Sequence, residues 1–268
     1  MKKRMASACI LAASAALALA VGPAAQAATA TEASAATLSK STVNSVSLGI
    51  TTKAKLTAST TVTITGGKPQ VLLEAVPTEW VTGAAVSLKQ TGVGDLISYG
   101  EPAAKCVATT VADTYTCTSS YTLDAATDVD NEDAGPLGLV VGIVAKDDSE
   151  RVITQTVSAS LKRVDKLTVK ASTTSIKKGA SVTITGTLTR ANWDEGKYSG
   201  YGGRTLTLLK RNAGSTTWAA VKTVTTDSHG NIKTTVKPGI SGAYRLAFAG
   251  NAISTSVGSL SSKSITVK

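Results

Sequence analysis

The chain alternates apolar and polar residues in short stretches, and turn residues separate these stretches about every ten positions. Successive side chains of a β-strand point to opposite faces, so this period-two pattern places one face of each strand in a core. An amphipathic helix would need apolar residues three and four positions apart. The pattern therefore predicts an all-β protein of two tandem sandwiches.

The C-terminal part of the chain shows this pattern most cleanly. After Asp165 we expect seven strands, a number that suits one β-sandwich of about 100 residues. The expected strands are 167–171, 181–189, 204–210, 217–225, 231–237, 243–249 and 264–267. The side chains expected to point inward are Val182, Ile184, Leu188, Leu206, Leu208, Ile232, Val236, Tyr244, Leu246 and Phe248.

The preceding part of the chain has the same alternation in a less regular form. Apolar residues alternate over 46–50, 62–64 and 86–88. Two longer strands are expected at 139–146 and 151–163, joined by the polar turn 147–150. Residues 41–165 are therefore expected to form the first sandwich, and residues 166–268 the second.

The first 27 residues have the parts of an export signal. Three basic residues follow Met1, an apolar run covers 5–21, and Ala25-Gln26-Ala27 supplies the small residues that precede a cleavage site. The run is short for a membrane span. We therefore expect a cleaved signal peptide and a secreted, extracellular protein without membrane insertion. Residues 28–40 are small, polar and aperiodic, and they are expected to form a flexible lead-in.

Two of the three cysteines remain after the signal is removed, because Cys9 lies inside it. Cys106 and Cys117 form an even pair in an oxidising compartment, which predicts a disulfide. The segment between them has the pattern of a hairpin whose turn lies near residues 111–114, so the two cysteines would face each other across it. Closing so small a loop stabilises the fold by about 3 kcal/mol in the chain-entropy description.

The two halves of the mature chain carry opposite net charge. Residues 41–165 contain 9 basic and 14 acidic residues, for a net charge of −5, whereas residues 166–268 contain 15 and 3, for +12. Such domains can attract each other or bind different partners. Their connection at 163–166 is short, so we expect a semi-rigid arrangement. The basic half would attract phosphates, but it has no nucleic-acid-binding motif, and export favours anionic cell-wall polymers over nucleic acid.

One segment of the basic half carries a family resemblance. In Gly242-Ala243-Tyr244-Arg245-Leu246, the tyrosine lies near the start of the sixth expected strand, where its ring can pack inward while its hydroxyl bonds a loop backbone. Leu246 takes the place of a cysteine in antibody domains.

With Trp218 and the Asp-rich turn before Gly230, this segment resembles the bacterial immunoglobulin-like repeat domains of secreted Gram-positive proteins of the actinobacterial type. The resemblance is clear over 166–268 and loose over 41–165. It implies a fold but no function, because such domains serve many roles.

Residues 124–133 concentrate carboxylates, with Asp128, Asp130 and Asp133 as candidate metal ligands. Calcium binds hard oxygen ligands, so this loop is a hypothetical calcium site. However, Asp133 stands where an EF-hand loop requires glycine. The simpler interpretation is a solvated acidic loop, in which case no cofactor is needed.

The segment 191–204 is the candidate for recognition, because it joins two strands at an end of the second sandwich where immunoglobulin folds display binding loops. Aromatic side chains would supply contact area and basic ones would attract an anionic or sugar-containing partner. The alternative is that the aromatics fold back and cover the open end of the sandwich. The candidate ligand-binding residues are Arg190, Trp193, Lys197, Tyr198, Tyr201 and Arg204.

No catalytic residues are expected to converge. His229 is the single histidine, and Asp227 and Ser228 precede it directly, an arrangement typical of turn chemistry and not of a catalytic triad. The sequence thus favours a non-enzymatic interaction or structural module at the cell envelope that contacts an extracellular protein or an anionic polymer. The alternatives are a carbohydrate or anionic-polymer binder that uses the segment 191–204, and a protease inhibitor that uses the disulfide hairpin.

Overall fold

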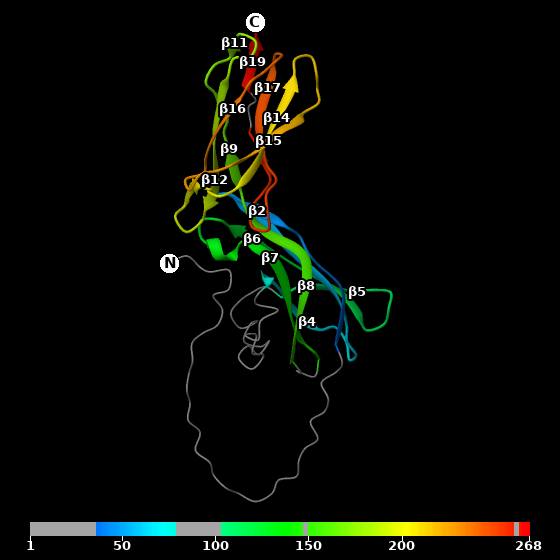
Figure 1. The fold of residues 1–268 in the computed structure, drawn as a ribbon. Coiled ribbons are helices and arrows are strands. Elements are labelled where there is room, and N and C mark those ends of the chain that lie inside the picture. The colour runs from blue at the N-terminus through cyan, green and yellow to red at the C-terminus, as the bar shows by residue number, and fades with distance from the viewer. Residues whose placement is uncertain (1–35, 79–102, 147–149, 260–262) are drawn as a thin grey trace, which may run out of the picture.

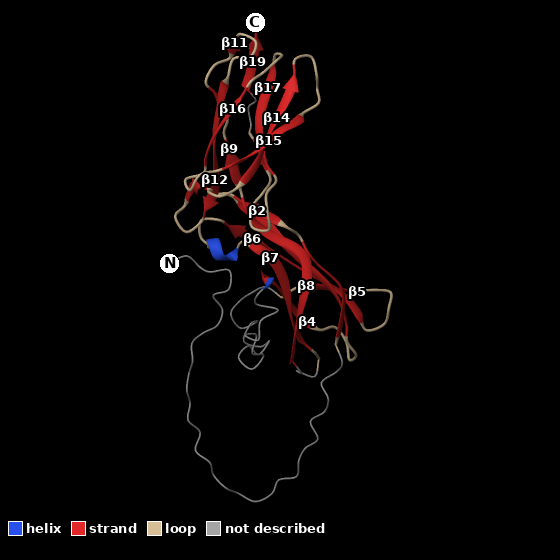
Figure 2. Cartoon of the chain, viewed as in Figure 1, coloured by secondary structure: helices blue, strands red, loops and turns tan. Residues whose placement is uncertain are grey.

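The computed structural model describes residues 36–78, 103–146, 150–259 and 263–268. The expected signal peptide, the expected strand at 86–88 and most of the turn at 147–150 lie outside the described residues. Strands make up both halves of the chain, and the two halves lie end to end with the C-terminus at the far tip (Figures 1 and 2). The prediction of an all-β protein is confirmed.

The first sandwich has two four-stranded sheets. One sheet has the order β1-β3-β6-β5, formed by β1 (Thr37–Val43), β3 (Lys53–Thr63), β6 (Thr114–Asp124) and β5 (Lys105–Ala108). The other has the order β2-β8-β7-β4, formed by β2 (Val46–Leu48), β8 (Glu150–Arg163), β7 (Gly135–Val144) and β4 (Gln70–Pro77).

This order matches an immunoglobulin constant-type domain, whose strands A, B, E and D form one sheet and C, F and G the other. Taken along the chain, β1, β3, β6 and β5 occupy the places of A, B, E and D, and β4, β7 and β8 those of C, F and G. β2 continues the first strand onto the opposite sheet, where it pairs parallel with β8. The half with the weaker sequence resemblance therefore has the complete strand order.

Alternation explains how these strands form a core. In β3 the side chains of Leu56, Ala58, Thr60 and Val62 are buried, while their neighbours are more exposed. β7 lies between β8 and β4 and is buried along most of its length.

The second sandwich has a related plan, but its strand β15 pairs with β14 in the second sheet, whereas the corresponding β5 of the first sandwich belongs to the first sheet. The first sheet has β12 at its centre, paired with β9, β10, β13 and β16, and the second has the order β11-β19-β17-β14-β15, with β18 paired to β17. The first sheet is formed by β9 (Asp165–Leu167), β10 (Lys170–Ala171), β12 (Val182–Asn192), β13 (Lys197–Gly200) and β16 (Asn231–Val236). The second is formed by β11 (Ser175–Ile176), β14 (Thr205–Asn212), β15 (Ala219–Thr225), β17 (Gly242–Phe248), β18 (Val257–Gly258) and β19 (Lys263–Val267).

All seven strands expected in this half are present, although the first is divided into β9 and β10. Every side chain expected to point inward is buried in the second core. Tyr244 is among them, so its ring packs inward as expected, and the expected bond from its hydroxyl to a loop backbone is not seen among the described residues. Burial raises the pKa of this hydroxyl.

The expected lead-in of 28–40 ends earlier than its predicted boundary. β1 begins at Thr37 and pairs with β3, and Leu38 packs against the first core. Leu38 and Val43 are the two apolar side chains of this otherwise polar edge strand, and they are five positions apart, so they give no period-two signal.

The predicted disulfide is present. Cys106 on β5 and Cys117 on β6 are directly opposite in the strand register, and their sulfur atoms are 2.02 Å apart. The turn falls near residues 111–114 as expected, and Asp113 adopts a positive φ of 54° there. The bridge lies within one sheet, between the places of strands D and E, and does not connect the two sheets as the antibody disulfide does.

Candidate functional site

The segment 191–204 is a hairpin that joins the two sandwiches. The last residues of β12 pair with β13 over Thr189–Asn192 and Lys197–Gly200, and a turn at 193–196 connects them. Trp193 lies in this turn and has no exposed surface. Together with Ala191, it belongs to the core of the first sandwich, although the chain reaches it only after entering the second.

Hydrogen bonds hold Trp193 in that core. Its indole Nε1 donates to the carbonyl oxygens of Gly49 at 2.8 Å and of Leu48 at 3.3 Å. Its backbone N–H donates to the side-chain oxygen of Asn131 at 3.0 Å. A buried indole usually finds such a partner for its N–H group. Trp193 therefore acts as an anchor between the sandwiches.

Asn131 completes the anchor from the side of the first sandwich. Its side-chain amide donates to the side-chain oxygen of Asn192 at 2.8 Å and to Asp194, and its backbone N–H donates to Asp194 at 2.9 Å. Asn131 belongs to the acidic loop, so part of that loop is a structural clamp. Sequence analysis missed this residue, because no local pattern connects a loop residue to a partner about 60 positions away.

The other aromatic side chains of the hairpin also lie at the junction. Tyr198 packs partly buried against the first core, and the Lys166 ammonium lies 3.7 Å from its ring centroid. A Cβ on Gly49 would lie 2.9 Å from the Tyr198 hydroxyl, so this close approach needs a glycine. Lys197 points outward and forms an exposed ion pair with Glu195 at 3.1 Å.

Tyr201 is buried between two arginines. The guanidinium carbons of Arg190 and Arg204 lie 3.9 Å and 4.4 Å from its ring centroid, and Phe248 meets the ring edge to face at 5.9 Å. Its hydroxyl accepts a hydrogen bond from the Asn251 side chain at 2.8 Å. These basic residues therefore contact an aromatic side chain of their own sandwich, an arrangement that holds their guanidinium groups in place.

The connection between the sandwiches has its own hydrogen bonds. The backbone N–H of Arg163 donates to Ile253, and the N–H of Val164 donates to Leu48. The Val164 carbonyl accepts from Ala191. Arg163 and Val164 are thus held by contacts with both sandwiches.

A group of charged side chains is buried beside this connection. Arg163 and Asp165 are 6% and 4% exposed, and neither carboxylate oxygen of Asp165 has a hydrogen-bond partner within 3.5 Å among the described residues. Burial raises the pKa of Asp165 to about 7, although the positive charge of Arg190 opposes the shift. Burial likewise lowers the pKa of Arg163 to about 10, and the neighbouring charge of Arg190 adds to that effect.

The end of the second sandwich that would display binding loops is therefore occupied by the first sandwich (Figure 1). Of the six candidate ligand-binding residues, Trp193 and Tyr201 are buried, and Arg190, Tyr198 and Arg204 are partly buried in contacts of the junction. Lys197 is the one that is exposed. The aromatics do fold back: Trp193 and Tyr198 pack against the first core at the interface between the two halves, whereas Tyr201 is buried in the core of the second sandwich.

The glycines near this hairpin serve close packing. A Cβ on Gly200 would overlap the backbone carbonyl of His229, and a Cβ on Gly202 would overlap the carbonyls of Asp227 and Ser228. The turn before β16 therefore lies directly on the hairpin. These glycines allow two backbone segments to touch.

The turn at His229 shows local hydrogen bonding. One carboxylate oxygen of Asp227 accepts from the backbone N–H groups of His229 and Asn231, and these bonds lower the pKa of Asp227. The Ser228 hydroxyl lies 3.1 Å from Nδ1 of His229. Because backbone groups occupy the carboxylate, it does not orient the imidazole as a catalytic triad requires.

The carboxylates of the acidic loop also bond to their own loop. Asp128 accepts from the Asp124 N–H at 2.8 Å and from the Thr127 hydroxyl at 2.7 Å, and Asp133 accepts from the Asp130 N–H at 2.7 Å. Across the part of the chain that the structure describes, no group of three His, Cys, Asp or Glu side chains is placed to hold a metal ion. The calcium hypothesis therefore gains no structural support from Asp128, Asp130 and Asp133.

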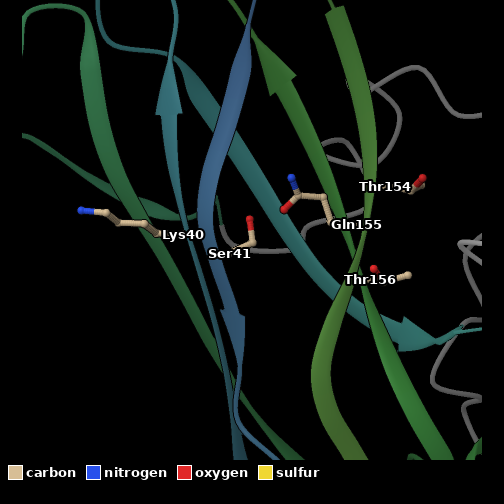
Figure 3. Close-up of a pocket in the computed structure, with 5 residues that line it drawn as sticks. All are labelled: Lys40, Ser41, Thr154, Gln155 and Thr156. Carbon is tan, nitrogen blue, oxygen red and sulfur yellow. The ribbon is translucent and has the colours of Figure 1, made fainter.

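A shallow, open hollow of about 630 Å³ lies on the first sandwich between β1 and β8. Its lining residues are Lys40, Ser41, Thr154, Gln155 and Thr156 (Figure 3). The strand register of β1 shifts between Ser39 and Thr42, so Lys40 and Ser41 form a bulge there. Ser41 Oγ lies 2.6 Å from Thr60 Oγ1, and the lining contains no acid or histidine that could activate it.

Comparison with known proteins leaves the chain without a family. No family model matches it, and no curated protein matches it. Similar solved structures include murine CEACAM1b, at 12% identity and a TM-score of 0.32, with 85% of this chain and 100% of that chain covered. They also include the IG1 and IG2 domains of DIP-gamma, at 12% identity and a TM-score of 0.28, with 87% and 97% covered.

A third similar structure contains the three N-terminal domains of the bacteriophage RB49 Highly Immunogenic Outer Capsid protein, at 10% identity and a TM-score of 0.33, with 87% of this chain and 70% of that chain covered. Structural similarities with TM-scores this low do not support a conclusion about fold or function. The assignment of immunoglobulin-like sandwiches depends on the strand order described above. No helix within the described residues has the length and apolar character of a membrane span.

Proposed function

We propose that the chain is a secreted, non-catalytic module of two immunoglobulin-like domains, residues 41–165 and 166–268, that acts by surface contact at the cell envelope after residues 1–27 are removed. The observation that carries the proposal is the junction, where Trp193 is buried in the core of the other sandwich. A joint of this kind keeps the two domains in one orientation, so the exposed surfaces are held at fixed positions.

Two further observations support this function. The Cys106–Cys117 bridge is consistent with an oxidising, extracellular compartment. The carboxylates of Asp128, Asp133 and Asp227 accept hydrogen bonds from backbone N–H groups of their own turns, and the Ser228 hydroxyl lies beside Nδ1 of His229. Groups that bond within their own turn stabilise that turn. We therefore expect the surfaces of the sheets to make the binding contacts.

The test is secretion and envelope retention of the full-length chain. We expect the released protein to begin at Ala28 and to be retained on purified envelope of the producing cell. X-ray scattering should show one elongated particle. Release with the first 27 residues still attached would contradict the predicted signal, and a released protein that no envelope fraction retains would contradict the proposed site of action.

The disulfide hairpin supports a second candidate function, inhibition of a protease by a rigid inserted loop. It projects from the side of the first sandwich (Figure 1), and Val107 and Val111 are 57% and 64% exposed on it. Exposed apolar side chains on a braced hairpin suit insertion into a binding cleft. Val111→Asp should abolish inhibition of an extracellular serine protease without lowering the melting temperature. Absence of inhibition by the unaltered protein would exclude this candidate.

A further inference from the structure

All charged side chains on the sheet β11-β19-β17-β14-β15 are positive. Its five strands contain no Asp or Glu, and they contain five basic residues. The basic residues are Lys210, Arg211, Lys222, Arg245 and Lys263. All three acidic residues of 166–268 lie elsewhere: Asp194 and Glu195 are at the junction, and Asp227 is in the turn that packs on the hairpin.

An arginine–tryptophan cluster, formed by Arg211, Trp218 and Arg245, lies on the outer face of this sheet. Tyr244 and Leu246 point into the core, so Arg245 between them points outward, and Arg211 lies diagonally across from it on β14. The guanidinium carbons of Arg245 and Arg211 are 4.4 Å and 5.1 Å from the Trp218 ring. One indole therefore holds two guanidinium groups together, and all three side chains are partly exposed.

No counter-charge neutralises this pair of cations. Neither guanidinium forms a salt bridge or a side-chain hydrogen bond with the described residues, and Nε of Arg245 is buried without a partner. Two like charges held near one ring repel each other, and an anion between them would remove that repulsion. The planar donors of arginine match the oxygen atoms of phosphate groups.

The surroundings extend the positive charge to the distal end of the molecule, defined as the end of the second sandwich opposite the junction. Lys177 and Lys178 follow β11, and Lys237 follows β16, and all three are exposed. The turn between β14 and β15, which ends at Trp218, lies at the same end (Figure 1). A row of cations suits a polymer with repeated negative charges better than a single small anion.

We propose that the arginine–tryptophan cluster is a binding site for a phosphate-bearing polymer of the cell envelope, with the polymer continuing over the basic distal end. The inference depends on the proposed function and deepens it, because it names the surface and the partner class. Arg211 and Arg245 contact the phosphate groups. Trp218 acts as a positioning residue, which keeps the two guanidinium groups at one point of the sheet.

The experiment measures binding of the full-length mature chain to immobilised inorganic polyphosphate at physiological salt. The site variant is Arg211→Gln with Arg245→Gln. The matched control is Lys170→Gln with Lys233→Gln, which removes the same charge from exposed positions on the other sheet of the same sandwich. We expect roughly a tenfold or greater rise in Kd for the site variant, and less than about a twofold change for the control.

The Trp218 variants test the positioning role. Trp218→Ala should raise the Kd although both arginines remain, and Trp218→Phe should restore much of the binding because an aromatic ring still supports the guanidinium groups. Melting curves of all variants identify any that fail to fold, and both site arginines lie on the sheet surface, so their replacement by glutamine should leave the melting temperature nearly unchanged.

Several outcomes would overturn the inference. Equal losses in the site variant and the control would show diffuse attraction to the net charge. Retention on polygalacturonate but not on polyphosphate would exclude phosphate as the recognised group. If the unaltered protein is retained on envelope and the site variant is retained equally well, the site fails while the proposed function stands. If the unaltered protein is not retained on envelope, the proposed function itself fails.

Discussion

Trp193 and Trp218 belong to the same sandwich and have opposite structural roles. Trp193 lies in the turn of the β12–β13 hairpin, is fully buried, and bonds backbone carbonyls of the other sandwich. Trp218 precedes β15 at the distal end, is partly exposed, and is flanked by two arginines. In the sequence, both are single tryptophans near glycine, threonine and basic residues.

The difference shows that the position of a loop in the assembled chain decides the role of its aromatic residues. Loops cluster at the two ends of an immunoglobulin-like sandwich, and a preceding domain can cover those at the end where the chain enters. Here the first sandwich covers that end, and the junction uses the aromatics as anchors. The opposite end and the outer sheet face remain open, so recognition is expected there.

The largest expected effect is the difference in stability loss between alanine substitutions of the two tryptophans. Trp193→Ala should lower the free energy of unfolding by about 3–5 kcal/mol, because it empties a large buried site in the first core. Trp218→Ala should cost less than about 1 kcal/mol, since its side chain remains in contact with water. Chemical denaturation monitored by far-ultraviolet circular dichroism measures both.

X-ray scattering separates anchoring from simple core packing. The Trp193→Ala variant, in conditions where it remains folded, should show a broader distribution of interdomain distances than the unaltered protein. Equal stability losses for the two tryptophans would mean that the proposed division between anchor and surface site is wrong.

The disulfide should stabilise the first sandwich alone. Replacing Cys106 and Cys117 with serine should reduce stability by about 3 kcal/mol, because the reduced unfolded chain gains loop entropy. Retention on polyphosphate should not change, as the arginine–tryptophan cluster lies on the other sandwich. Thermal melts with and without a reductant provide the measurement, and a reduced protein that melts at the same temperature would contradict the expectation.

Asp165 should make the junction less stable as the pH rises. Its pKa is raised from 3.8 to about 7 in the folded protein. Between these values the folded state holds a proton that the unfolded state has released, so the stabilisation is complete below about pH 4 and is lost as the pH rises through 7. The expected loss between pH 5 and pH 8 is on the order of 2 kcal/mol.

The control for this effect is Asp165→Asn, which has no proton to release at this position. Its stability should decline less than that of the unaltered protein over the same pH interval, as measured by urea denaturation at each pH. Parallel declines in the two proteins would show that another group controls the pH dependence.

The smallest expected effect concerns the exposed end of the hairpin. Lys197→Ala removes an ion pair with Glu195 in which the side chains are 66% and 51% exposed. Such a pair contributes between 0 and about 1 kcal/mol, and salt screens it. Neither the melting temperature nor envelope retention should change measurably. A clear loss of retention would restore the segment 191–204 as a binding site.

Sequence analysis recovered the features that depend on local periodicity. The seven strands of the second sandwich, their inward residues and the Cys106–Cys117 hairpin were all predicted, because alternation and cysteine pairing are properties of neighbouring residues. The strands β1, β4 and β13 and the two-residue strands β11 and β18 were missed. β11 and β18 are short segments that become strands by pairing with partners distant in the chain.

The role of the segment 191–204 at the junction was not predicted from the sequence. The segment forms a hairpin from β12 to β13, and Arg190 stacks on Tyr201. Its partner in the structure is the chain itself, through Asn131 and the carbonyls of Leu48 and Gly49. The contact with Asn131 joins residues more than 60 positions apart, and the contact with Leu48 joins residues more than 140 positions apart. Local periodicity does not encode contacts over such separations.

The amino-acid order by itself determined which faces of the strands are apolar, where turns fall, which cysteines pair and how charge divides between the halves. Each of these properties depends on neighbouring residues or on a sum over residues. They therefore do not depend on how the two sandwiches pack against each other. The tertiary structure alone decided that one tryptophan anchors the joint while the other holds two arginines at the surface. Burial depends on which surfaces pack together, and those surfaces are set only when the two sandwiches fold and meet end to end.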